Sequence, residues 1–323
     1  MTVKDRFGAV AWVTAALFVF AVATQAAGKA GDDPRVLIDP RVRPAAHADI
    51  RVDTNLVLVP VSITDHKNHP VLGIDARQFR VFEGKAEQDV VNVSSEDTPV
   101  SVGIVFDASG SMANKLPKAR EAVAEFLKSA NPSDEFFLVN FAASPALAVP
   151  FTTNPGEIRN RLMYATTTGK TALLDAVHLA LEYMKDARNP RRSLLVISDG
   201  GDNDSRYTET EIRRMVRETG VWVYTIGVYA GAPAILPEEE RGGPKLLTDL
   251  AEETGGRHFA IQNANGLPAA AAKIALELRN QYLLGYRPKN MERDGKYHKV
   301  QVRLVDSGDL LLSWRPGYYA PGQ

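Results

Sequence analysis

Strand-like and helix-like runs alternate along this chain from Val100 to Arg279. The strand-like runs are short and rich in β-branched and aromatic residues, whereas the helix-like runs repeat apolar residues every three or four positions. The expected strands cover residues 100–106, 135–141, 193–197, 221–228 and 257–261, and the expected helices cover 115–129, 159–165, 171–186, 209–218, 246–253 and 269–279. Strands that alternate with helices form a mostly parallel sheet with helices on both faces. We therefore predict a Rossmann-like α/β domain.

The segments on either side of this block carry strand signals and no convincing helix. The strand-like runs are 55–64, 78–83 and 90–94 before the block, and 282–287, 299–305 and 310–314 after it. Each flank alone offers few strands for a stable core. We therefore expect the flanks, 51–97 and 281–323, to form one smaller β-rich, sandwich-like domain in which the α/β domain, 98–280, is inserted. Two independent β elements are the alternative. Pro60 predicts an edge position or a bulge in the first run.

The amino-terminal end has the three parts of a secretory signal. Lys4 and Arg6 precede an apolar stretch from Phe7 to Ala23, and small residues follow it. This order is typical of a signal peptide. An uncleaved signal anchor is the alternative, because the stretch is near the roughly 17-residue lower limit for spanning a bilayer. We predict a signal peptide over 1–27, a linker over 28–50, and export to the periplasm or the medium.

The composition excludes several classes of function. The 323-residue chain has no cysteine, which removes thiol nucleophiles, cysteine zinc sites, iron–sulfur clusters and disulfides. Its 38 Lys and Arg residues nearly balance 39 Asp and Glu residues, so the charge gives no reason to expect a nucleic-acid partner. Membrane contact is expected only through an uncleaved signal anchor, and the composition predicts no oligomeric state.

The strongest candidate site starts directly after the first strand of the predicted α/β domain, with Asp107-Ala-Ser109-Gly-Ser111. Ligands of open α/β sheets bind at the carboxyl ends of the strands. A carboxylate and two hydroxyls at alternating positions suit a hard cation such as Mg²⁺, which prefers oxygen ligands. Thr171 stands before a predicted helix and Asp199 ends another predicted strand, so we expect all five side chains to converge at one edge of the sheet.

These three segments together resemble the metal-ion-dependent adhesion site of the von Willebrand factor A (VWA) domain. The resemblance covers about residues 98–280 and implies a VWA fold. It implies that Ser109, Ser111 and Thr171 approach Mg²⁺, or Mn²⁺ or Ca²⁺, through their hydroxyls. Asp107 and Asp199 would act largely through water or hydrogen bonds. An Asp or Glu of a partner protein would then complete the coordination of the metal.

Two further features bear on this resemblance. Lys170 stands where the family usually has glycine, and it would bring a positive charge beside the metal. In the flanks, Phe79-Arg-Val-Phe-Glu and Arg315-Pro-Gly-Tyr-Tyr-Ala-Pro resemble an exported family of bacterial VWA-related proteins. That likeness implies export and the inserted architecture, and it implies no particular activity.

The residues favour binding over catalysis. Neutral hydroxyls leave a bound cation electrophilic, so it would gain from one external carboxylate, and no general base is evident in the sequence. The predicted function is an exported, metal-dependent protein-binding module rather than an enzyme. A structural or assembly role in an envelope complex is one alternative, and a metal-dependent hydrolase is another.

Other polar motifs have simpler interpretations. Gly169-Lys170-Thr171 ends like a phosphate loop, but Tyr164 stands where the first glycine of that loop is required. Asp202-Asn203-Asp204 lacks the glycine and glutamate of a calcium loop, so a solvated loop or a rim of the main site is expected. The histidines, among them His178, are expected to be packed or solvated.

Overall fold

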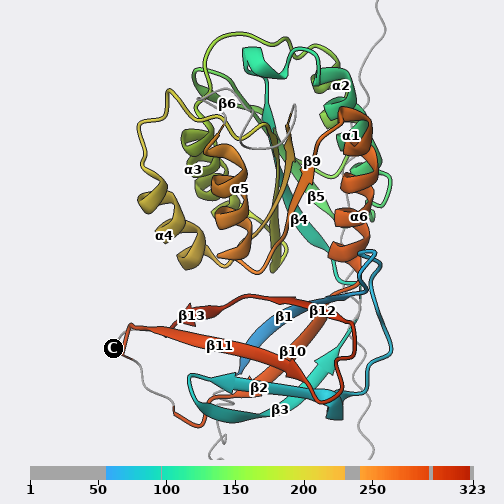
Figure 1. Cartoon of the computed structure of the whole chain (residues 1–323), viewed down its shortest axis with the longest axis vertical. Helices are drawn as coiled ribbons and strands as arrows, with labels where there is room; N and C mark the ends of the chain where they lie inside the picture. Colours follow the sequence, from blue (N-terminus) through green and yellow to red (C-terminus); the bar gives the residue numbers. More distant parts are fainter. Residues whose placement is uncertain (1–55, 96, 230–240, 291–293, 321–323) are drawn as a thin grey trace, which may run out of the picture. The chain divides into compact units, whose positions relative to one another are not determined.

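The computed structural model describes residues 56–95, 97–229, 241–290 and 294–320 (Figure 1). The predicted signal peptide and linker lie outside the described residues. Within the described ranges, no helix combines the length and the apolar character needed to cross a membrane.

The middle of the chain forms a six-stranded sheet in the order β6-β5-β4-β7-β8-β9. Its strands are β4 (Val100–Asp107), β5 (Glu135–Phe141), β6 (Pro145–Thr152), β7 (Arg191–Ser198), β8 (Trp222–Val228) and β9 (His258–Ile261). Every neighbouring pair is parallel except β5 and β6, which are antiparallel. The predicted mostly parallel sheet is confirmed. The edge strand β6 is an element that the sequence did not reveal.

Helices cover both faces of this sheet, as predicted (Figure 1). Helices α1 (Leu116–Leu127), α2 (Pro155–Met163) and α6 (Leu267–Arg279) share one hydrophobic core with β4, and α3 (Leu173–Tyr183), α4 (Glu209–Thr219) and α5 (Gly243–Glu252) share the other. Successive side chains of a strand point to opposite faces, so Ile104 lies in the first core and Val105 in the second. β4 is buried along its whole length, so its last residue, Asp107, is buried at the carboxyl end of the strand.

The two flanks join in one antiparallel sheet of seven strands, in the order β12-β1-β10-β3-β2-β11-β13. Its strands are β1 (Val57–Thr64), β2 (Phe79–Glu83), β3 (Ala86–Ser94), β10 (Tyr282–Arg287), β11 (Tyr297–Leu304), β12 (Leu311–Trp314) and β13 (Gly317–Tyr319). Short 3-10 turns cover Ala76–Gln78, Gly110–Met112, Met184–Asp186 and Ala264–Gly266. Strands from before and after the α/β block are interleaved, so the predicted fold class, an α/β domain inserted in a β-rich domain, is confirmed.

Pro60 lies inside β1, and a proline within a strand is expected at a sheet edge or a bulge. β1 pairs with β10 on one side and with β12 on the other, so the expected edge position is wrong for the strand as a whole. However, β12 pairs only with Val61–Thr64, so among the described strands β1 has a neighbour on one side only at Pro60. The missing N–H of proline is tolerated there, because the sheet is locally open.

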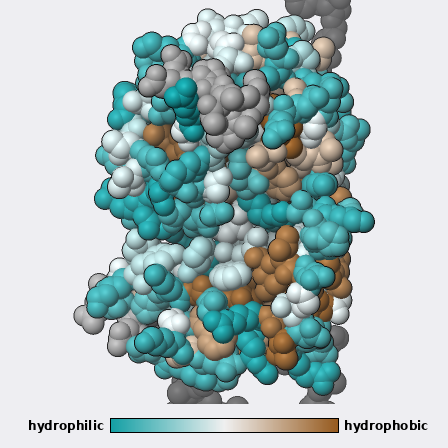
Figure 2. Space-filling view, in the orientation of Figure 1, coloured by the Kyte–Doolittle hydropathy of each residue, from teal (hydrophilic) through white to brown (hydrophobic). Residues whose placement is uncertain are grey.

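Apolar side chains also reach the surface of the antiparallel sheet. Leu58 on β1, Val91 on β3 and Leu311 on β12 are each about half exposed, and Figure 2 shows apolar surface over this part of the molecule. Exposed apolar atoms are common on folded proteins, so we infer no site from them.

A cluster of ionisable groups ties β2, β10, β11 and β13 together. His298 on β11 is hydrogen-bonded through Nδ1 to Glu83 Oε1 at 2.5 Å and through Nε2 to Asp294 Oδ1 at 3.2 Å. The hydroxyls of Tyr286 and Tyr318 donate to Glu83 Oε2. The hydrogen bond to Glu83 is the main cause that raises the pKa of His298 above its ordinary 6.5. The imidazole, with 13% of its side chain exposed, therefore favours its charged form.

This arrangement predicts a pH-dependent contribution to stability. Because the folded state raises the pKa of His298, its contribution is fully present below the unfolded pKa of 6.5 and is lost as the pH rises through the folded pKa. Urea unfolding should show His298→Gln to be less stable than wild type by about 1 kcal/mol at about pH 5.5, with a smaller deficit at about pH 9. His69→Gln is the control, because His69 pairs with Asp65 on the surface with 63% of its side chain exposed. A deficit that is the same at both pH values would contradict the prediction.

Candidate functional site

The predicted site residues lie around the carboxyl ends of β4 and β7. Asp107 is the last residue of β4, and Asp199 follows β7, its parallel neighbour. The loop that leads to α3 comes alongside, because Thr168 N–H donates to Ala108 O at 2.9 Å and Gly110 N–H donates to Gly169 O at 3.2 Å. Segments that are far apart in the sequence are thus brought to one edge of the sheet.

Asp107 is a buried carboxylate with both oxygens hydrogen-bonded. Oδ1 accepts the backbone N–H of Ser109 at 2.8 Å, and Oδ2 accepts the hydroxyl of Ser198 at 2.5 Å. Its residue exposure is 0%. Burial, and then the nearby charge of Asp199, raise the pKa of Asp107 to about 6. The carboxylate fixes the turn after β4 and contributes negative charge beside Ser109.

The two serines of the turn place their hydroxyls side by side. Ser109 Oγ and Ser111 Oγ are 3.1 Å apart, and Ser109 is buried whereas Ser111 is exposed. The short 3-10 turn Gly110–Met112 produces this spacing, because it folds the chain back within three residues. Two adjacent hydroxyl oxygens in a turn held by a buried carboxylate are a suitable start for a cation site.

Thr171 is held by the loop that follows Asp199. Its backbone N–H donates to Asn203 Oδ1 at 2.9 Å, and its carbonyl oxygen accepts the N–H groups of Asn203 and Asp204. Asp202 Oδ1 accepts the N–H of Leu174 at 3.3 Å. The N-cap residue of α3 makes no side-chain cap of its own. The loop expected to be solvated or a rim therefore supplies the missing cap and fixes Thr171.

The cation beside the site is not the one that the sequence suggested. Lys170 Nζ forms an ion pair with Asp204 Oδ1 at 2.9 Å, with 67% of its side chain exposed, so its charge is directed to the rim loop. Lys115, at the N-cap of α1, instead donates from Nζ to Asp199 Oδ2 at 2.9 Å. No local sequence signal marks this contact, because a lysine at a helix start is normally solvated.

Gly200 keeps Asp199 in place through a close backbone approach. Its φ is +81°, and a Cβ there would lie 2.6 Å from Gly243 Cα at the start of α5. Asp199 follows β7 directly, so a shift at Gly200 would be transmitted to its carboxylate.

We expect Gly200→Ala to destabilise the fold by more than the roughly 1–3 kcal/mol of a strained backbone alone. Gly73→Ala is a matched control, because Gly73 has the same φ of +81° with nothing within 4 Å of its Cβ position. The difference between the thermal unfolding temperatures of the two variants measures the clash with Gly243, because both variants share the strain of the positive φ. Equal losses of stability would show that the approach of Gly243 does not matter.

The donor set fits a hard cation that is bound through hydroxyls. Among the described residues, no group of three or more His, Asp or Glu side chains is arranged to hold a metal ion. The metal ligands that the resemblance implies are the hydroxyls of Ser109, Ser111 and Thr171, and this assignment stays a prediction. Oxygen donors of this kind suit Mg²⁺, which keeps several of its waters.

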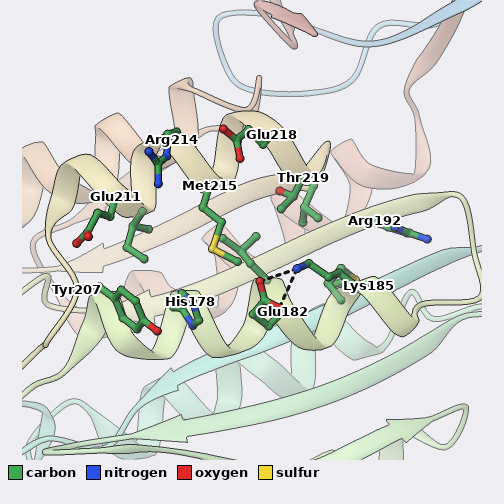
Figure 3. A pocket seen from close by; sticks show the side chains of 14 residues that line it. His178, Glu182, Lys185, Arg192, Tyr207, Glu211, Arg214, Met215, Glu218 and Thr219 are labelled. Atoms are coloured by element: carbon green, nitrogen blue, oxygen red, sulfur yellow. Dashed lines mark hydrogen bonds and ion pairs between the residues drawn. The ribbon is translucent and has the colours of Figure 1, made fainter. Parts of the chain in front are cut away.

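A separate hollow lies between α3 and α4, and Figure 3 shows its lining. His178 stacks on Tyr207 at one end, with ring centroids 3.9 Å apart, which confirms the packed role expected for this histidine. Met215 and an ion pair between Glu182 and Lys185 line the hollow further along. None of the five predicted site residues lines it, so this hollow is distinct from the edge described above.

Comparisons with known proteins bear on the α/β part. Residues 102–201 match the family model of the von Willebrand factor type A domain. An uncharacterized protein of Borreliella burgdorferi is 24% identical over 182 residues, which cover 50% of this chain and 53% of that protein. The chain spans about half the length of the curated relatives it matches.

Two solved structures of bacterial proteins are similar to part of this chain. The conserved hypothetical protein BatB from Bacteroides thetaiotaomicron is 22% identical, with 55% of this chain and 98% of that chain covered and a TM-score of 0.45. A von Willebrand factor type A protein from Catenulispora acidiphila is 13% identical, with 80% and 71% covered and a TM-score of 0.49. The family match over residues 102–201 includes the segments that carry Asp107, Thr171 and Asp199, and this chain carries a von Willebrand factor type A domain.

Proposed function

We propose that this chain is an exported protein-binding module that engages an acidic side chain of a partner through a divalent cation. A von Willebrand factor type A domain is an interaction or adhesion module, which is the general part of this function. The specific part rests on one observation. The hydroxyl oxygens of Ser109 and Ser111 lie 3.1 Å apart in a turn whose Ser109 N–H is bound by the buried carboxylate of Asp107.

The distribution of charge supports metal-dependent docking. Asp107 and Asp199 are both fully buried, and their oxygens accept hydrogen bonds from the protein. The direct donors, Ser109, Ser111 and Thr171, are neutral. A Mg²⁺ ion held by such donors would keep most of its positive charge and would supply a position for a carboxylate oxygen. An Asp or Glu of the partner is therefore favoured, and a basic side chain is repelled.

The proposal includes export, because Lys4, Arg6 and the apolar stretch from Phe7 to Ala23 have the order of a signal peptide. In this proposal the site binds a partner and is not a catalytic centre. The carboxylates behind the hydroxyls are engaged in holding the turns of the site, so neither is free to act as a general base.

The first test is a calorimetric titration of Mg²⁺, and in parallel Mn²⁺, into the purified chain. Binding should occur in wild type and should be lost in Ser111→Ala, which removes one hydroxyl from an exposed position. Ser307→Ala is the control, because Ser307 is an exposed serine in the turn between β11 and β12. The absence of metal binding in wild type would overturn the proposal.

The second test addresses the partner. Peptides with a central Asp or Glu should bind the chain in Mg²⁺ and should dissociate in EDTA, whereas the Asn and Gln versions should not bind. Binding that survives EDTA, or that does not distinguish acid from amide, would favour an assembly role in which the metal is secondary.

A further inference from the structure

We infer that Lys115 is a built-in cation of this site, which neutralises Asp199 in the metal-free protein and which a divalent metal must displace. The inference rests on the proposed function, because it concerns the same site. In this inference Lys115 sets the metal affinity of the site.

The geometry of Lys115 makes it part of the site. Its ammonium donates to Asp199 Oδ2 at 2.9 Å, although the two residues are 84 positions apart in the sequence. Only 14% of the lysine side chain and 0% of the aspartate side chain are exposed. The backbone of Lys115 is fixed in the first turn of α1, because its N–H donates to Met112 O and its carbonyl accepts Ala119 N–H. The side chain thus reaches from α1 to the end of β7.

The ion pair between Lys115 and Asp199 balances negative charge at this edge of the sheet. Asp107 and Asp199 are two fully buried carboxylates whose charges repel each other. A buried charge without a partner is strongly destabilising, so the metal-free site needs a positive charge. Lys170 does not supply it, because its ammonium pairs with Asp204. Lys115 supplies it, and the metal-free edge can therefore keep its fold.

The same contact opposes metal binding. An ammonium and a divalent cation repel each other, and both are attracted to Asp199. Lysine carries a compact charge on a flexible four-carbon chain, and the Lys115 side chain is not completely enclosed. It can therefore move outward when a metal enters, but the broken ion pair lowers the net affinity. The site should bind metal weakly when alone, and an acidic partner should raise its metal affinity by adding a ligand.

Lys115→Met tests the inference, because methionine has a similar reach and no charge. Calorimetric titration of Mn²⁺ should give an affinity at least about tenfold tighter than that of wild type, which corresponds to about 1.4 kcal/mol. In EDTA the variant should unfold at a lower temperature than wild type, and Mn²⁺ should reverse this loss. Lys118→Met is the matched control and should change neither quantity, because its ammonium pairs with Glu121 on the exposed face of α1.

The outcomes separate this inference from the proposed function. If wild type and Lys115→Met bind Mn²⁺ equally, Lys115 is not a competing cation, although the metal site stands. If neither binds Mn²⁺, the proposed function fails as well. Lys115→Arg keeps the charge and guards against a folding defect in the methionine variant. It should retain the weak binding of wild type, and a tenfold gain in this variant would contradict the inference.

Discussion

Replacing Asp107 with asparagine is expected to weaken Mg²⁺ binding by about 10–100-fold, the usual cost of losing a supporting group behind metal ligands. Asparagine keeps the shape of the side chain and an oxygen that can accept the N–H of Ser109. The turn that places Ser109 and Ser111 should therefore survive. What is lost is the buried negative charge beside Ser109.

The same variant should be more stable than wild type when no metal is present. Burial, together with Asp199, raises the pKa of Asp107 from 3.8 to about 6, so the charged form is disfavoured in the folded state. The stability of wild type should therefore fall as the pH rises from about 4 to about 6, and Asp107→Asn should not share this loss. At about pH 7 in EDTA the gain should be about 1–3 kcal/mol. A site retained for function at a cost in stability behaves in this way.

Two measurements check these expectations. Calorimetric titration of Mg²⁺ gives the affinity, and urea unfolding in EDTA at about pH 4 and about pH 7 gives the stability and its pH dependence. Asp134→Asn is the control for affinity, because Asp134 is also fully buried but accepts the N–H of Val100, at the opposite end of β4. A variant that binds Mg²⁺ as wild type does would exclude Asp107 from the metal site.

The sequence predicted those parts of the site that follow from strand order. Val100–Asp107 and Arg191–Ser198 are buried parallel neighbours, so the polar residues at their ends, Asp107 and Asp199, had to lie at one edge. Such strands are visible as short apolar runs, because both of their faces are covered by helices. The binding of a metal by these residues, and the domain boundaries, stay predictions.

Two features of the site that the sequence did not predict are contacts between distant segments of the chain. Asp202 caps the start of α3 from a different loop, and Lys115 reaches Asp199 across the site, so neither contact has a local signature. β6 was missed for a different reason. Pro145–Thr152 contains two prolines and is partly exposed, because it is an antiparallel edge strand, so it has little of the continuous apolar character of the other strands.

The largest loss of stability is expected from Asp134→Ala, at the amino end of the parallel sheet. Asp134 is fully buried, with Oδ1 accepting the N–H of Val100 at 2.9 Å and Oδ2 accepting that of Asn131 at 2.7 Å. Both of its oxygens also pair with Arg279, at the end of α6. Removing one partner of a buried ion pair costs about 3–5 kcal/mol. The alanine variant leaves the guanidinium and two backbone N–H groups without these acceptors.

The same arginine provides an internal control. Arg279 Nη1 also pairs with Asp97 Oδ1 at 3.2 Å, but 44% of the Asp97 side chain is exposed. An exposed pair contributes only about 0–1 kcal/mol, because water and salt screen it. Urea unfolding of Asp134→Ala and Asp97→Ala should therefore differ by several-fold in free energy, with an unchanged m-value if only the native state is affected. Similar losses in the two variants would mean that Arg279 does not anchor α6 to the start of β4 through Asp134.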